Sequence, residues 1–174
     1  MSGLPSASAA ALQTVSGDRY LPMVMAAVTR ARTSVRVLQY ILDTRPDADP
    51  THSVGHLLRC LSLAAARGVD VSVLLHDYES PAAGAGNLPG ALFLTRRGAS
   101  VRLFHPRSDE QRRVLHTKAV VVDGKYSVVG TQNWSPGAFL SNDEAGVGVE
   151  SCAFAQQLSI FFDGMWARSK EPHQ

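Results

Sequence analysis

Residues 115–133, LHTKAVVVDGKYSVVGTQN, contain the pattern that decides the fold of this chain. Asp123 and Gly124 form a dipeptide that strongly favours a two-residue β-hairpin turn. It separates residues 118–122 from residues 125–130, two runs that are rich in β-branched side chains. The stretch therefore predicts an antiparallel hairpin with Asp123 and Gly124 at its tip.

A two-residue turn also predicts how the two strands align. Lys118 would face Val129, and His116 would face Thr131. Because side chains alternate across a strand, one face at the open end would carry four polar side chains. These are His116, Lys118, Thr131 and Asn133. A nucleophile, a cation, a hydroxyl and an amide would converge without a carboxylate among them, which predicts a phosphate-type anion site that contains a nucleophile.

The same residues resemble a known signature, the HKD motif of the phospholipase D superfamily, written H-x-K-x4-D-x6-G-[ST]-x-N. It occupies 116–133 here, with every fixed position filled: His116, Lys118, Asp123, Gly130, Thr131 and Asn133. The family often continues with a bulky residue and then N-x-E. Trp134 and the run from Asn142 to Glu144 stand in those places.

The resemblance implies a role for each polar residue. His116 would attack phosphorus and form a covalent phosphohistidine, while Lys118 and Asn133 would hold the phosphoryl oxygens. Thr131 would either add a hydroxyl to the substrate site or pack and hydrogen-bond locally, which is its commoner role. Glu144 is the candidate for orienting a histidine through its ring N–H. Two-step catalysis of this kind needs no metal and no other cofactor.

Asp123 names the motif, but we expect it to be structural. It lies five residues from Lys118, which is roughly 16 Å along an extended strand. Aspartate suits a turn because it tolerates left-handed backbone and bonds its own chain. Gly130 is also expected to be structural, since it allows another part of the backbone to approach closely.

Hydrophobic periodicity predicts alternating helices and strands on both sides of the motif. Helices are expected near 21–31, 51–67 and 87–97, the last capped by Asn87, with strands at 34–42, 69–75, 99–105 and 144–149. A closing helix follows Ser151, with a predicted core stripe of Phe154, Leu158, Phe161, Phe162 and Met165.

This order predicts a mixed α/β (α+β) fold, with a mixed central β-sheet flanked by helices on both faces. Together with the resemblance, it indicates a single phospholipase D-like catalytic domain over residues 18–170. Residues 1–17 are small and polar without a period, and they are interpreted as a mobile N-terminal arm.

Two features lie beside the motif. Arg112 and Arg113 directly precede it, where they would contact substrate phosphates or belong to a solvated loop whose acidic residues cancel their charge. His76 ends a predicted strand, where ligands often bind in α/β folds. It is interpreted either as a rim residue near substrate or as a hydrogen-bonded surface histidine.

Composition bounds the remaining possibilities. The chain has 174 residues and a formal net charge of +2, which suits one domain without a strongly basic footprint. Cys60 and Cys152 are expected to be buried and reduced, which favours a cytoplasmic location. No apolar run approaches the ~18 residues of a membrane span, and no secretory signal is recognised.

The leading hypothesis is a metal-independent nuclease that acts on DNA or RNA, because short family members with one motif resemble small bacterial nucleases. The alternatives are a phospholipase D or cardiolipin-type lipid phosphodiesterase, and a non-catalytic nucleic-acid-binding module on the same fold. One motif supplies one His116. The chain is therefore expected to form a homodimer with a shared active site on the two-fold axis.

Overall fold

The computed structural model describes residues 11–44, 53–77, 86–106 and 113–172. These residues form a seven-stranded mixed sheet in the order β1-β7-β6-β5-β2-β3-β4. The strands are β1 (Ala11–Ser16), β2 (Ser34–Gln39), β3 (Asp70–His76), β4 (Ser100–Phe104), β5 (Ala119–Val122), β6 (Tyr126–Gly130) and β7 (Ala145–Glu150). The helices are α1 (Tyr20–Arg30), α2 (Ser53–Ala66), α3 (Leu88–Thr95), α4 (Pro136–Leu140) and α5 (Cys152–Trp166), with a short 3-10 turn at Gly17–Arg19.

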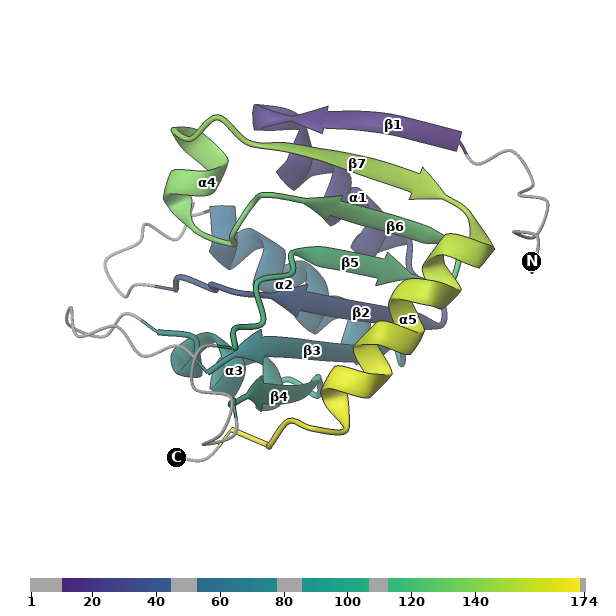
Figure 1. Ribbon diagram of the computed structural model, residues 1–174. Helices are drawn as coiled ribbons and strands as arrows, with labels where there is room; N and C mark the ends of the chain where they lie inside the picture. The colour runs from purple at the N-terminus through teal and green to yellow at the C-terminus, as the bar shows by residue number, and fades with distance from the viewer. Residues whose placement is uncertain (1–10, 45–52, 78–85, 107–112, 173–174) are drawn as a thin grey trace.

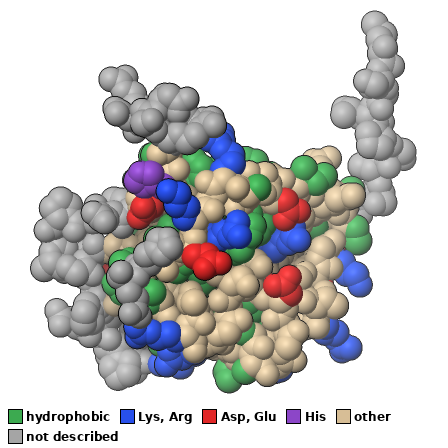
Figure 2. Space-filling model, turned by 90° about the horizontal axis from the view of Figure 1, so that it is seen from below, with side chains coloured by type: hydrophobic (Ala, Val, Ile, Leu, Met, Phe, Trp, Pro, Cys, Tyr) green, Lys and Arg blue, Asp and Glu red, His purple; other side chains and the backbone are tan. Residues whose placement is uncertain are grey.

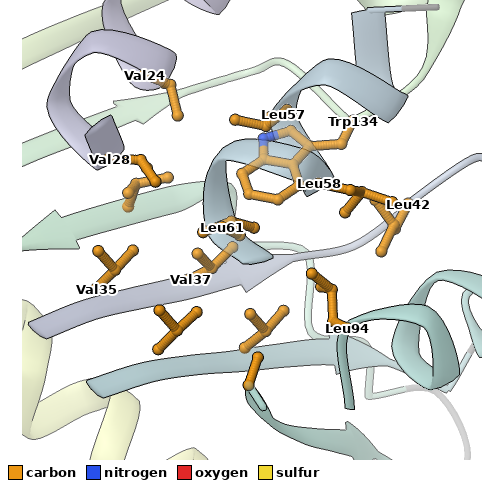
Figure 3. Close-up of a cluster of buried hydrophobic side chains, with 14 of the residues drawn as sticks. Val24, Val28, Val35, Val37, Leu42, Leu57, Leu58, Leu61, Leu94 and Trp134 are labelled. Carbon is orange, nitrogen blue, oxygen red and sulfur yellow. The ribbon is translucent and has the colours of Figure 1, made fainter. Parts of the chain in front are cut away.

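Helices lie on both faces of the sheet, which confirms the predicted fold class. α1, α2 and α3 pack on one face, and α5 runs diagonally across the other (Figure 1). Figure 3 shows the larger core, where Leu61 of α2 lies over Val37 of β2 and Val28 of α1 lies over Val35. Trp134, which follows the motif, is fully buried in this core. The strand ends that carry the motif are therefore anchored by close packing.

Fewer apolar side chains of α5 are buried than the sequence predicts. Phe162 and Met165 are buried, but Phe161 is 45% exposed, so the predicted five-residue core stripe is wrong at that position. The expectation of two buried thiols is also wrong, because Cys152 is exposed at the start of α5 and Cys60 is only half-buried. None of the helices that the structure describes is both long and apolar enough to cross a membrane.

The interpretation of residues 1–17 as a mobile arm is wrong for its second half. Residues 11–16 form strand β1, which pairs antiparallel with β7 at the edge of the sheet. Only Val15 of this strand is buried, so it lacks the alternating apolar pattern that marks a strand in sequence. Its backbone hydrogen bonds to β7 define it instead. Residues 1–10 lie outside the described part of the chain.

The motif hairpin forms where it was predicted, but its register differs by one residue. Lys125 N donates to Val122 O at 3.0 Å and closes the turn over Asp123 and Gly124, which both have positive φ. Val122 nevertheless pairs with Tyr126. Lys125 is left as an extra residue, and its carbonyl accepts the N–H of Ser151 at 2.9 Å.

The extra residue changes which side chains stand opposite each other. Val129 pairs with Ala119, and Gly130 N donates to Lys118 O at 3.2 Å. The predicted pairing of Lys118 with Val129, and hence of His116 with Thr131, is therefore wrong. Strand alternation therefore does not place the four polar residues on one face. Thr131 and Asn133 lie in the irregular chain after Gly130.

Asp123 ties the hairpin tip to the start of β2. Its Oδ1 accepts hydrogen bonds from Thr33 N at 2.8 Å, Thr33 Oγ1 at 2.9 Å and Ser34 N at 3.0 Å, and Arg32 N adds a bond at 3.1 Å. Burial would raise the pKa of Asp123, but these hydrogen bonds hold that pKa below its ordinary value. The carboxylate therefore links two chain segments far apart in sequence.

We expect Asp123→Ala to lower the free energy of unfolding by about 2 kcal/mol, because several N–H and O–H donors lose a charged acceptor. Asp123→Asn should lose less and retain substantial activity, since Asn keeps one acceptor oxygen and tolerates left-handed backbone. Urea unfolding at neutral pH measures both changes.

The pH dependence follows from the lowered pKa of Asp123. The ionised carboxylate stabilises the folded state above its ordinary pKa, and this contribution is lost as the pH falls through the folded-state value. The stability gap between the wild type and Asp123→Asn should therefore narrow in acid. Equal stability of the wild type and Asp123→Ala at neutral pH would contradict the assignment.

Candidate active site

The sheet order gathers the motif residues at one end of neighbouring strands. β5 begins where β2 and β6 end, because Ala119 pairs with both Leu38 and Val129. β7 begins opposite the end of β6, where Gly130 pairs with Gly146. The polar residues next to these strand ends are Tyr40, His76, His116, Lys118, Thr131, Asn133 and Glu144.

His116 and Lys118 are in direct contact. The ammonium Nζ of Lys118 lies 3.1 Å from each ring nitrogen of His116 and donates to the His116 carbonyl at 2.8 Å. Lys118 is 5% exposed, whereas His116 is exposed. The site thus offers an accessible imidazole whose ring is backed by a buried cation.

The Lys118 ammonium is buried, and burial disfavours its charged form. Burial lowers the pKa of Lys118, although the negative charge of Glu144 acts in the opposite direction. A bound anion would compensate for the water that the ammonium has lost, because an opposite charge nearby favours the charged form. The electrostatics at Lys118 therefore suit a phosphate group.

Glu144 is near this pair but bonds to other groups. Thr131 Oγ1 donates a short hydrogen bond to one of its oxygens, and Asn142 Nδ2 donates to the other at 3.1 Å. Ala145 N in turn donates to Thr131 Oγ1 at 3.1 Å. No hydrogen bond joins Glu144 to His116 within the described chain, so a histidine-orienting role for Glu144 stays a prediction.

Asn133 lies at the end of the motif, half-buried. Its Oδ1 is enclosed and has no hydrogen-bond partner among the described residues. The structure therefore does not join Asn133 to the His116–Lys118 pair by a hydrogen bond. Gly130 leaves room for this turn of the chain, because a Cβ there would lie 3.0 Å from Ala145 O and would collide with the Gln132 side chain.

The structure places only one of the two candidate arginines. Arg113 is exposed three residues before His116. Arg112 lies outside the described residues. Within the described ranges, no group of three His, Cys, Asp or Glu side chains is arranged to hold a metal ion.

Two residues of this region were missed or misread in the sequence. Tyr40 follows β2, and its ring centroid lies 4.8 Å from that of His116; only its position after a strand could have drawn attention to it. His76 is 8% exposed, so its interpretation as a surface histidine is wrong. Its ring centroid lies 5.4 Å from that of Tyr40.

The sequence and the fold of this chain are similar to those of known proteins. The chain is 29% identical over 166 residues to cardiolipin synthase A of Escherichia coli, covering 94% of this chain and 32% of the relative. It thus spans about a third of the length of such relatives.

Two solved structures match over nearly the whole of both chains. One is a phospholipase D family member, Nuc from Salmonella typhimurium, with a TM-score of 0.74, 19% identity and coverage of 95% of this chain and 100% of that one. The other is NucT from Helicobacter pylori, with a TM-score of 0.74, 17% identity and coverage of 94% and 99%.

The match to a family model is decisive. Residues 24–166 match the model described as the PLD-like domain of cardiolipin synthase, and this range contains the complete HKD motif together with strands β2 to β7. The chain therefore belongs to the phospholipase D-like family, and its fold is that of the phosphodiesterases of this superfamily.

Proposed function

We propose that this protein is a metal-independent phosphodiesterase that hydrolyses nucleic acid through a phosphohistidine at His116. The observation that carries the proposal is the contact between the exposed His116 ring and the buried Lys118 ammonium. An imidazole can attack phosphorus near neutral pH. A cation already removed from water beside it stabilises the extra negative charge of the transition state.

The reaction would proceed in two balanced steps. A ring nitrogen of His116 forms a bond to phosphorus while the bond from phosphorus to the leaving alkoxide oxygen breaks. The alkoxide takes a proton from His116 of the partner subunit. In the second step that histidine accepts a proton from water, the water oxygen bonds to phosphorus, and the phosphorus–nitrogen bond breaks. Lys118 and Asn133 would hold the non-bridging oxygens throughout.

The choice of nucleic acid is supported by the match in length to Nuc and NucT and by the resemblance to small single-motif nucleases. Figure 2 views the molecule from the β4 side, where basic and acidic side chains are interspersed. With a net charge of +2, attraction of a polyanion would depend on local charge at the site, including Lys118 and the adjoining Arg113.

A lipid phosphodiesterase is the second candidate. It is favoured by the identity to cardiolipin synthase A, a relative that is much longer than this chain. Several large apolar side chains are also exposed, among them Leu140, which is 77% exposed on α4 after the motif. The shared chemistry is the same attack on a phosphodiester, so only the substrate distinguishes the two candidates.

We expect the protein to cleave nucleic acid in excess EDTA. Labelled single-stranded DNA, duplex DNA, RNA and phosphatidylglycerol vesicles would be incubated in parallel, with a His116→Ala preparation as the control for contaminating enzymes. Cleavage of vesicles alone would move the assignment to a lipid enzyme. Complete loss of activity in EDTA that Mg²⁺ restores would refute the metal-independent mechanism, and binding without cleavage would favour a non-catalytic module.

A further inference from the structure

We infer that Tyr40 is a positioning residue, whose ring holds the His116 imidazole and the Lys118 ammonium in their mutual arrangement. This inference rests on the proposed function of that pair. The Tyr40 ring lies 4.8 Å from the His116 ring between centroids, with the planes tilted by 54°. The Lys118 Nζ lies 5.3 Å from the same Tyr40 centroid. One aromatic ring therefore contacts both partners of the candidate reacting pair.

The contact suits the two groups for different physical reasons. Tilted aromatic rings at this separation attract each other through the edge and face of their π-systems. An ammonium within about 6 Å of a tyrosine ring is attracted by its negative face. Lys118 carries a long side chain with much rotational freedom. Tyr40 therefore restricts the two side chains that must meet phosphorus together.

The backbone beneath Tyr40 is fixed by a buried amide. Asn87 Nδ2 donates to Tyr40 O and to His76 O, at 2.7 Å each, and its Oδ1 accepts from Leu42 N at 2.7 Å. Asn87 is 1% exposed and fills the N-cap position of α3 without capping it. It connects the chain after β2 to the end of β3, just beyond Gln39 and Leu75, the last pair of the ladder.

His76 also packs against the Tyr40 ring. Its ring lies 5.4 Å from Tyr40 and 6.2 Å from Phe104, and Leu115 N donates to its Nδ1 at 3.4 Å. Burial lowers the pKa of His76, the charge of Asp77 acts to raise it, and His105 and His116 lower it further. A neutral ring is needed to accept that bond, which holds the residue preceding His116.

Removal of the ring should affect the chemical step more than substrate binding. Lys118 would still be present to attract an anion, but the nucleophile and the cation would no longer be held together. Misplacement of reacting groups by about 1 Å costs on the order of 10²-fold in rate. We therefore expect Tyr40→Leu to lower kcat by about 10²-fold with KM little changed, and Tyr40→Phe to stay close to the wild type.

The matched control is Tyr126→Leu. Tyr126, like Tyr40, is half-buried, but it lies in β6 beside the hairpin tip, where it pairs with Val122. All variants would be assayed with bis(p-nitrophenyl) phosphate, well below their measured melting temperatures. The inference is overturned if Tyr40→Leu keeps its kcat, if only KM changes, or if Tyr126→Leu loses kcat equally.

A second measurement keeps the inference separate from the proposed function. The ring protons of His116 are observable by NMR and are assigned by their loss in His116→Ala. They should shift in Tyr40→Leu, because the neighbouring ring is gone, and stay in place in Tyr40→Phe and Tyr126→Leu. If the wild type is inactive but the His116 resonances show this pattern of shifts, only the proposed function is refuted. If the His116 resonances are unchanged in Tyr40→Leu, the positioning role of Tyr40 is refuted.

Discussion

His116→Ala is expected to abolish turnover while leaving the fold intact. In enzymes that form a covalent intermediate, loss of the nucleophile lowers kcat by on the order of 10⁴-fold or more. The side chain is exposed, so its removal creates no cavity in the core and should change stability by about 0.5 kcal/mol at most. Initial rates on the substrate identified in EDTA, together with a thermal melt, measure both effects.

Two neighbouring variants test the roles assigned around the nucleophile. Lys118→Ala and Asn133→Ala should also be severely impaired, because each removes a group assigned to the phosphoryl oxygens. His56→Ala is the matched control, since it removes another histidine, which is half-buried near the start of α2. An active, folded His116→Ala protein would require a different nucleophile. A dead, folded Asp123→Asn protein would place the turn residue in the reaction.

The hairpin and the fold class were readable in the sequence because they depend on local chemistry. Asp123 and Gly124 adopt the left-handed backbone that the turn requires, with φ values of 52° and 60°. The register was not readable, since it depends on whether Lys125 joins the β6 ladder. That residue instead bonds Ser151, a contact between positions 26 residues apart along the chain.

Residues whose roles depend on tertiary contacts could not be identified from the sequence either. Asn87 has the sequence context of a helix cap, yet its side chain bonds the backbone of Tyr40, Leu42 and His76. Hydrophobic periodicity could not distinguish this role. A residue that caps α3 and a buried residue that bonds neighbouring backbone would occupy the same position before the helix. In contrast, His116 and Lys118 were identified from the motif spacing, and the structure brings their side chains into contact.

The proposed reaction has one requirement beyond the attacking His116, which is a proton for the leaving group. The leaving alkoxide needs a proton donor, and each chain supplies one His116. His76 is buried and its Nδ1 already accepts a backbone bond, so it is poorly placed to deliver a proton. A second His116 across a two-fold axis would supply the donor, and it would also double Lys118 around the phosphate.

Subunit mixing tests this shared site directly. Wild type and His116→Ala would be unfolded and refolded together at fixed total protein, so that subunits combine at random. If each site needs two intact copies, activity falls as the square of the wild-type fraction, to about a quarter at equal mixing. Mixing with His56→Ala is the control and should leave activity unchanged. A linear fall to one half, or an active monomer by light scattering, would mean that each chain holds a complete site with its own acid.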